Sequence, residues 1–261
     1  MTIREEVIGD CRLILGDCRE ILPRLDRPSA IASDPPYGQK LNTNVTGRSV
    51  SGRKPGAGRE YRVPAKGSLR SPPKTAVVWP TGILGDDRPF DPEHLLQASD
   101  RVLLWGAHKF GHKLPRGRWL AWDKVPTGKI RDQGDGELAW TNVEPDAALR
   151  IYRLLWDGVC VGPAARHEVT AGTQRAHPTQ KPEALMSWCL GFLNLTAGAV
   201  ICDPYMGAGS TGVAAVRAGY GFVGIELEQI YFDTACRRVE EAYRQPRLFA
   251  DAPVVSQTVQ H

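Results

Sequence analysis

Four short apolar runs constrain the fold of this chain more than any other feature of its sequence. Each run has the length and composition of a strand buried on both faces of a sheet, and each ends at an acidic residue or a turn. The runs are Cys11–Leu15 before Gly16-Asp17, Ala30–Ser33 before Asp34, Ala199–Cys202 before Asp203, and Gly221–Ile225 before Glu226. Ligands of open α/β sheets bind beyond the carboxyl ends of the strands, so we expect the four acids to converge on one crevice.

Helical patterns lie between and after these runs. Ser210–Ala218 carries small and apolar residues at helical spacing and stops at Gly219, a residue that commonly ends helices. Thr179–Leu195 is predicted to be helical, with a hydroxyl cap at its start and Pro182 in its first turn. The remaining predictions are a helix over Glu228–Tyr243 and strands over Arg101–Trp105 and Arg118–Trp122. This alternation predicts an α/β fold with a mostly parallel, twisted sheet and helices on both faces.

Length and composition favour one soluble enzyme-sized domain. We expect a single domain over residues 1–244 of the 261 and a disordered tail over 245–261. The six cysteines form no C-x-x-C pair, which argues against a zinc site or a disulfide framework, and no metal is expected. The charged N-terminus lacks the apolar core of a signal peptide, and no apolar stretch approaches ~20 residues, so the expected location is the cytoplasm, with no membrane partner.

Positive charge is concentrated in one irregular insertion, residues 39–76. Between residues 39 and 74 it holds nine lysines and arginines and one glutamate, an excess larger than the +4 of the whole chain. The stretch is rich in Gly, Ser and Pro and has little apolar periodicity, so it is expected to be mobile without a partner. A charge run is often only a solvated loop, but the size of this one favours contact with phosphates of a nucleic acid.

The turn Asp34-Pro35-Pro36-Tyr37 is the first candidate for chemistry. Two consecutive prolines fix φ and remove two backbone donors, which leaves a rigid turn with outward carbonyls. An aspartate and a carbonyl on such a turn accept both hydrogens of an amino group, and the tyrosine ring offers a face for a flat base. A simple strand-ending turn with a surface tyrosine is the alternative.

Two further segments have the pattern of a nucleotide-type site. Asp203–Gly212 joins a strand to a helix, and its glycines let the backbone approach a ligand while the helix N-terminus suits a carboxylate. Glu226 ends the next strand, at the distance expected for an acid that binds ribose hydroxyls. His177–Pro182 stands at a helix start, where a hydroxyl, a lysine and free backbone donors suit a carboxylate, although a plain helix cap explains it equally well.

Together, the three segments resemble the motifs of the amino-methyltransferases of DNA, in the permuted order called the β group. In that family the catalytic D-P-P-Y motif comes first, followed by H-P-T-x-K-P and then by the D-P-F-x-G-x-G cofactor motif. Here the order is Asp34–Tyr37, His177–Pro182 and Asp203–Gly212. The resemblance implies a Rossmann-like, circularly permuted methyltransferase fold, S-adenosylmethionine as cofactor, and double-stranded DNA as partner. Its match is close over residues 10–38 and 177–240 and loose over 100–125.

The resemblance also implies roles for the matching residues. Asp34, Pro35, Pro36 and Tyr37 would be catalytic, with Asp34 and the Pro35 carbonyl on the target amino group and Tyr37 stacked on the flipped base. The residues that would hold the cofactor come from all three motifs and from the first strand end: Asp17, Asp34, Thr179, Lys181, Asp203, Tyr205, Gly207, Gly209, Ser210, Thr211 and Glu226.

The resemblance also implies which part of the cofactor each of these residues would contact. Asp17 would lie near the adenine, Glu226 on the ribose, and Thr179 and Lys181 on the methionine end. Tyr205 stands where the family usually has phenylalanine; the aromatic ring is retained, so no loss is expected.

The expected function is site-specific methylation of N6 of a flipped adenine, of the kind found in restriction–modification systems. Candidate phosphate contacts in the basic insertion are Arg48, Arg53, Lys54 and Arg59, and 125–176 is the candidate target-recognition region. N4-cytosine methylation is the nearest alternative, because the same turn can present a cytosine amino group. Family members acting on cytosine more often have serine at the position of Asp34, so the aspartate favours adenine. Methylation of RNA and a non-catalytic DNA-binding protein are further alternatives. The sequence carries no nuclease-like motif, and a homodimer is compatible with the resemblance.

Overall fold

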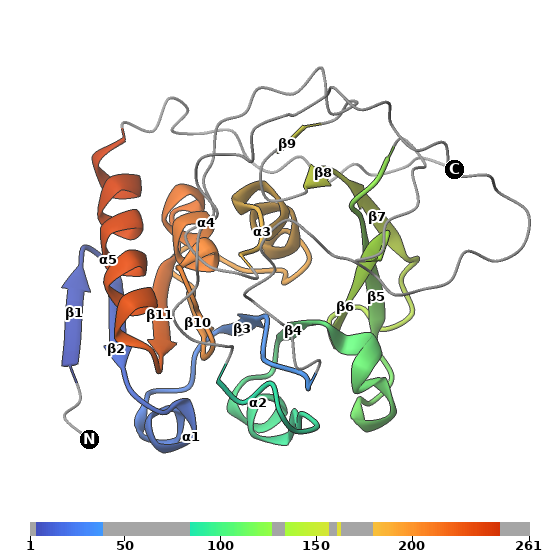
Figure 1. The fold of residues 1–261 in the computed structure, drawn as a ribbon, viewed down its shortest axis with the longest axis horizontal. Helices are drawn as coiled ribbons and strands as arrows, with labels where there is room; N and C mark the ends of the chain where they lie inside the picture. Colours follow the sequence, from blue (N-terminus) through green and yellow to red (C-terminus); the bar gives the residue numbers. More distant parts are fainter. Residues whose placement is uncertain (1–3, 39–83, 127–133, 157–160, 163–179, 246–261) are drawn as a thin grey trace, which may run out of the picture.

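The computed structural model describes residues 4–38, 84–126, 134–156, 161–162 and 180–245 (Figure 1). The strands are β1 (Arg4–Ile8), β2 (Cys11–Leu15), β3 (Ala30–Ser33), β4 (Val102–Trp105), β5 (Arg118–Asp123), β6 (Gly136–Thr141), β7 (Arg150–Arg153), β8 (Leu155–Trp156), β9 (Val161–Gly162), β10 (Val200–Asp203) and β11 (Gly221–Glu226). The α-helices are α1 (Cys18–Ile21), α2 (Glu93–Ala98), α3 (Glu183–Leu190), α4 (Ser210–Ala218) and α5 (Gln229–Arg244), with short 3₁₀ turns at Leu22–Arg24, Ala107–Lys109 and Gly111–Lys113.

Nine of these strands form one sheet in the order β1-β2-β11-β10-β3-β4-β6-β5-β7. Its middle strands, β2, β11, β10, β3 and β4, run parallel to one another. β1 pairs antiparallel with β2, and β6 pairs antiparallel with both β4 and β5. β8 and β9 form a separate antiparallel pair. The sheet is therefore mixed, with the parallel core that the four apolar runs predict.

Helices cover both faces of the sheet. In Figure 1, α3, α4 and α5 lie above it and α1 and α2 below it. Each layer has its own core: Val213, Phe222 and Phe232 belong to the first, and Ile31 and Leu95 to the second. Fully burying one such Leu, Ile or Phe side chain contributes roughly 1.5–3 kcal/mol, so the two layers supply much of the stability of the fold. The expected layer arrangement is confirmed; the circular permutation remains a prediction.

The six predicted strands are confirmed to within one residue at either end, and so are the helices over Ser210–Ala218 and Glu228–Tyr243. The prediction over Thr179–Leu195 was wrong at both ends, since α3 spans only Glu183–Leu190. Pro182 has an extended backbone and precedes the helix instead of standing in its first turn. A residue before proline is disfavoured in the helical region, so Lys181 is held outside the helix.

The topology places the switch point of the sheet between β10 and β3. From β10 the chain continues through α4 to β11 on one side, whereas β4 lies on the other side of β3. Crevices that bind ligands form at such points, outside the carboxyl ends of the strands. The carboxyl ends here are Asp203, which ends β10, and Asp34, which follows β3.

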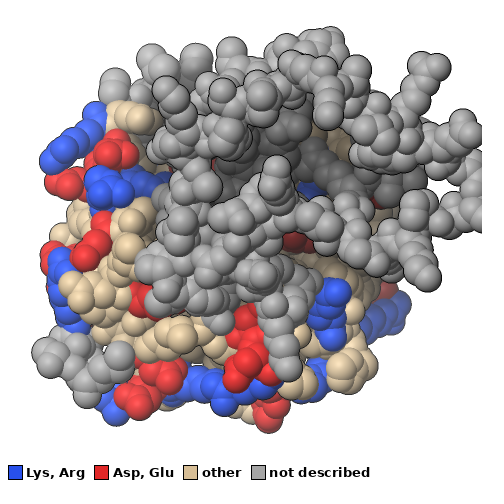
Figure 2. Space-filling model, viewed as in Figure 1, with Lys and Arg blue, Asp and Glu red and all other residues tan. Residues whose placement is uncertain are grey.

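Among the described residues, no helix is long and apolar enough to cross a membrane. The same part of the chain contains no cluster of histidine, cysteine and acidic side chains suited to a metal ion. On the face shown in Figure 2, acidic and basic side chains of the described residues are interspersed.

Candidate functional site

A cavity of about 530 Å³ opens at the carboxyl ends of β2, β3, β10 and β11. Its lining brings together most of the residues singled out from the sequence: Asp17, Asp34, Pro35, Pro36, Tyr37, Lys181, Asp203, Tyr205, Gly207, Ser210, Thr211 and Glu226. The four acids at the strand ends therefore converge as expected. Gly209 is not part of the lining, and Thr179 lies outside the described residues.

Asp203 is the hydrogen-bonding centre of one half of this cavity, which we call the cofactor half because the sequence predicts that its residues hold the cofactor. Its Oδ1 accepts from Ser33 Oγ at 2.6 Å and from the Tyr205 amide at 3.1 Å, and its Oδ2 accepts from Thr211 Oγ1 at 2.5 Å. Burial raises the pKa of Asp203 to about 6, against these donors, which lower it. Because protein donors occupy both oxygens, Asp203 acts by holding β3, β10 and the start of α4 in register.

Glu226 holds the glycine-rich turn in the same way. Its Oε2 accepts from the Gly207 amide at 2.9 Å, and its Oε1 accepts from the Glu228 amide at 2.8 Å. Burial raises the pKa of Glu226 to about 7, and the backbone donors only partly offset this. Gly209 has φ of +78°, and a Cβ there would lie 2.9 Å from that of Ala235, so α5 packs directly against the turn. The turn is thus shaped before any ligand arrives.

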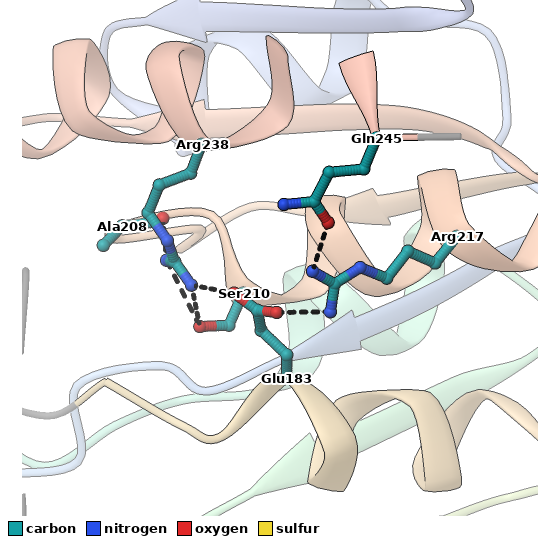
Figure 3. Close-up of polar contacts among 6 residues, drawn as sticks. All are labelled: Glu183, Ala208, Ser210, Arg217, Arg238 and Gln245. Atoms are coloured by element: carbon teal, nitrogen blue, oxygen red, sulfur yellow. Dashed lines mark hydrogen bonds and ion pairs between the residues drawn. The ribbon is translucent and has the colours of Figure 1, made fainter. Parts of the chain in front are cut away.

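Arg238 of α5 fastens this turn to α3. Its guanidinium contacts the carbonyl oxygen of Ala208 and lies 3.5 Å from Ser210 Oγ, and it donates to Glu183 Oε1 at 2.7 Å (Figure 3). Arg217 of α4 donates to the other oxygen of Glu183 at 2.6 Å. Both ligand-facing segments, the turn before α4 and the extended segment before α3, are therefore tied together through one glutamate.

Asp17 and Tyr205 complete the cofactor half. Asp17 caps α1 by accepting from the Arg19 amide at 2.8 Å. The Tyr205 hydroxyl lies 3.0 Å from His94 Nε2, and His94 Nδ1 lies 3.1 Å from the carbonyl oxygen of Asp91. A carbonyl only accepts, so Nδ1 carries the proton and Tyr205 donates to Nε2. Burial lowers the pKa of His94 to about 4, which keeps the ring neutral.

The Asp34 turn lies in the other half of the cavity, which we call the target half because the sequence predicts that this turn binds the target base. Asp34 contacts the Lys181 ammonium through Oδ2, while its Oδ1 is buried and accepts no hydrogen bond from the described residues. Burial raises the pKa of the Asp34 carboxyl, and Lys181 opposes that rise. An unpaired buried acceptor costs free energy, so this oxygen is a natural place for a ligand's donor.

Tyr37 is placed by a glycine. A Cβ on Gly106 would lie 2.2 Å from Tyr37 Cε1, so the ring packs where another residue would carry its side chain. Gly106 also has φ of +67°, a conformation that favours glycine. The His108 ring lies 6.5 Å from the Tyr37 ring, centroid to centroid. On its other side the turn is held by Asp86, which accepts from the Gly38 amide at 2.8 Å.

Lys181 is paired with carboxylates of the protein itself, which the sequence did not predict. The resemblance places it on the methionine end of the cofactor, whereas the structure buries its ammonium between two carboxylates, in contact with Asp34 and 3.1 Å from Glu137 Oε2. Glu137 in turn contacts the Lys124 ammonium. Burial raises the pKa of Glu137, but the two lysines outweigh it and hold that pKa low, at about 2.

Sequence reasoning missed Glu137, Lys124, His94 and Arg238. Glu137 falls inside the candidate recognition region 125–176, yet it belongs to β6, and β6 and β7 are strands of the main sheet. A charged residue within an otherwise apolar strand (GELAWT) was the available signal. The rest of that region is described only in part. The basic insertion 39–76, with Arg48, Arg53, Lys54 and Arg59, lies outside the described residues.

Comparison with known proteins gives matches to DNA methylases. Residues 119–237 match the N6/N4 methyltransferase family, described as DNA methylase. The type II methyltransferase M2.DpnII of Streptococcus pneumoniae is 44% identical over 64 residues, 24% of this chain and 24% of that protein. The type II methyltransferase M.HinfI of Haemophilus influenzae is 38% identical over 73 residues, 28% of this chain and 20% of that protein.

The matched segments thus span a quarter or less of the length of each relative. Among solved structures, the M1.HpyAVI–SAM complex covers 87% of this chain and 99% of its own, with 18% identity and a TM-score of 0.48. Residues 119–237 thus carry the sequence pattern of the DNA methylase family.

Proposed function

We propose that this chain is an S-adenosylmethionine-dependent DNA methyltransferase whose target is an exocyclic amino group, N6 of adenine in double-stranded DNA. One observation carries the proposal. Asp34, on the rigid Pro35-Pro36 turn, lines the same cavity as Glu226 and Gly207, and its Oδ1 is a buried acceptor that no described residue fills. An amino-group acceptor and a nucleotide-type site thus share one cavity at the switch point of the sheet.

The cavity fits this cofactor in size and chemistry. Its volume of about 530 Å³ lies within the roughly 300–1,000 Å³ typical of small-molecule sites. Met206 and Ile225 supply apolar wall for a ring, and Asp17 and Glu226 supply acceptors for amino and hydroxyl groups. The N-terminus of α4 at Ser210 suits a carboxylate. When bound, S-adenosylmethionine supplies a methyl group whose bond to a positive sulfur breaks with the electron pair left on sulfur.

The residues at the turn make the target nitrogen nucleophilic. An amino nitrogen conjugated into a base ring is a poor nucleophile, because its lone pair is shared with the ring. Asp34 and the Pro35 carbonyl accept its two hydrogens and draw it toward tetrahedral geometry. The lone pair then forms the new nitrogen–carbon bond, and the proton that the nitrogen must lose passes to Asp34 and on to solvent. Positioning supplies much of the remaining rate.

Tyr37 would hold the flipped base by stacking its ring on that base. A base must leave the duplex to reach the cavity, which costs a few kcal/mol. Stacking on an aromatic ring contributes ~1–3 kcal/mol per base and offsets part of that cost. The basic insertion 39–76 directly follows this turn in the sequence, so its cations would contact phosphates beside the flipped base. Sequence preference would come from the region 125–176.

The choice between adenine and cytosine rests on Asp34, since the resemblance associates serine at this position with cytosine. The test is mass analysis of nucleosides from DNA and RNA incubated with isotope-labelled S-adenosylmethionine. We expect label in N6-methyladenine of duplex DNA. Label in N4-methylcytosine would move the target to cytosine, and label only in RNA would replace the substrate. DNA binding without label in any nucleoside would identify a non-catalytic binding protein.

A further inference from the structure

Lys181 is surrounded by charge that comes from three separate parts of the chain. Asp34 follows β3, Glu137 stands on β6 and Lys124 follows β5, while Lys181 comes immediately before Pro182 and α3. Contacts join them in the order Asp34, Lys181, Glu137, Lys124, so that the signs of charge alternate. The side chain of Lys181 is 7% exposed, and those of the other three are 17–18% exposed.

In this arrangement the Lys181 ammonium is already engaged by two carboxylates, those of Asp34 and Glu137. Removing a charge from water is costly unless partners compensate it, and here two carboxylates do so for one ammonium. To reach a cofactor carboxylate, Lys181 would have to leave Asp34 and Glu137 with one cation fewer between them. Ser210, at the N-terminus of α4, lines the same cavity and can meet a carboxylate instead.

We propose that Lys181, anchored by Glu137, is a positioning residue for methyl transfer: it binds Oδ2 of Asp34 and so leaves Oδ1 as the ionised acceptor for the target amino group. The assignment rests on the proposed function and gives Lys181 a role other than cofactor ligand. Glu137 fixes the direction of the ammonium, and Lys124 balances the charge of Glu137.

The groups facing Asp34 determine what each substitution does to its ionisation. Burial raises the pKa of Asp34; Lys181 and, more weakly, Lys124 lower it, and Glu137 raises it. Among the described residues, the charge of Asp34 in turn raises the pKa of Tyr37 and of Asp203. Removing the lysine therefore raises the pKa of Asp34, and neutralising Glu137 while keeping its shape lowers it.

The first experiment needs no turnover. The Asp34 carboxyl carbon is followed by ¹³C NMR against pH in aspartate-labelled protein, with Asp34→Asn to identify its signal. For Lys181→Met we expect the midpoint of the Asp34 titration to rise by roughly 1–3 pH units, the size typical of an opposite charge within contact. The same sample is titrated with S-adenosylmethionine by calorimetry, and its affinity should stay within about threefold of the wild type. Lys181→Gln is the second variant, and circular dichroism verifies folding.

The second experiment measures the pH dependence of kcat on duplex DNA. In Lys181→Met the acid limb should move to higher pH, and below that limb kcat should fall about tenfold for each pH unit by which the limb moves. In Glu137→Gln the acid limb should move to lower pH, whereas Glu137→Ala, which removes the anchor, should lower kcat more than tenfold. A folding defect lowers the amount of active protein but does not move the limb in opposite directions. Arg244→Met, at an exposed pair on α5, is the matched control for loss of a cation.

Two results would overturn the assignment. One is an unchanged Asp34 titration in Lys181→Met; the other is a cofactor affinity weakened more than tenfold with an unmoved acid limb, which would return Lys181 to the cofactor. If the wild type transfers no methyl group to DNA, the proposed function fails, and the positioning role in that reaction fails with it. The NMR titration would still decide whether Lys181 sets the ionisation of Asp34, so the two failures are distinguishable.

Discussion

The two halves of the cavity differ in the hydrogen-bond partners of their buried carboxylates. On the cofactor half, Asp203 accepts three hydrogen bonds and Glu226 accepts two, all from the protein itself. On the target half, one carboxylate oxygen of Asp34 contacts the Lys181 ammonium, and the other accepts no hydrogen bond from a described residue. The acids of the first half shape a site in advance, and the acid of the second half keeps an acceptor for a ligand. Substitutions should therefore affect binding on one side and chemistry on the other.

The largest effect is expected for Asp34→Ala. The Pro35 carbonyl would be left to accept one amino hydrogen, and the carboxylate that accepts the other would be lost. Methyl transfer should therefore fall by about 10³-fold or more, while affinity for S-adenosylmethionine and for DNA stays near that of the wild type. The measurement is single-turnover transfer of labelled methyl, with calorimetry for the cofactor. Normal turnover would show that the Asp34 turn is not the catalytic one, and the contrast between the halves would disappear.

Asp203→Ala should give the reverse pattern. Ser33, Thr211 and the Tyr205 amide would lose a shared acceptor, so the turn that shapes the cofactor half would loosen and affinity for S-adenosylmethionine should fall by about 100-fold. Calorimetry on the folded variant tests this. Thr211→Val, which removes only one of the three donors, should cause a smaller loss. Wild-type affinity in both variants would place the cofactor elsewhere.

Replacing Arg53, Lys54 and Arg59 together with alanine extends the comparison to the basic insertion. Three phosphate contacts fewer should flatten the log–log dependence of DNA affinity on salt by about 2–3 units, on cognate and scrambled duplexes alike. Discrimination between the duplexes should survive, because phosphate contacts position and base contacts specify. An unchanged slope would exclude the insertion from DNA binding, and lost discrimination with intact nonspecific affinity would move sequence reading into it.

Glu226 should make the stability of the protein depend on pH. Burial raises its pKa from 4.5 to about 7 in the folded state. Between those values the folded state holds a proton that the unfolded state has lost, so the free energy of unfolding should decrease as pH rises from about 4.5 to 7. Asp203, with a folded pKa of about 6, adds a decrease of the same sign. Thermal melts of the wild type and Glu226→Gln across this range test it.

The variant should show a shallower decrease, and Glu241→Gln, an exposed residue on α5, should match the wild type. Equal pH dependence in Glu226→Gln and the wild type would show that Glu226 is not protonated in the folded state.

The smallest effect is expected for Tyr205→Phe. It removes the hydroxyl that donates to His94 but keeps the ring, so the loss should be about 1 kcal/mol of stability, with cofactor affinity changed no more than a few-fold. Denaturant unfolding and calorimetry measure the two quantities. A loss of affinity as large as that of Asp203→Ala would make the hydroxyl itself a ligand contact.

Local pattern was enough to predict the parallel core and the meeting of its acids. Apolar runs of strand length, each followed by an acid, place those acids at carboxyl ends, and parallel strands bring such ends to one edge. Asp17, Asp34, Asp203 and Glu226 line one cavity for that reason. The helix over Ser210–Ala218 could also be predicted, because the helical spacing of its apolar residues and the glycine that ends it are features of the segment itself.

Only the tertiary structure decided which charges meet. Lys181 and Glu137 are 44 positions apart, and their contact depends on β6 lying beside β4, an order that neither segment encodes alone. The contact of Arg238 with the carbonyl oxygen of Ala208 and the hydrogen bond between Tyr205 and His94 likewise join segments that are far apart in the sequence. A motif predicts which residue types a segment brings to the cavity, because strand and turn geometry are local. The partner of each buried charge follows from strand order and helix packing, because these decide which desolvated groups lie within reach of one another.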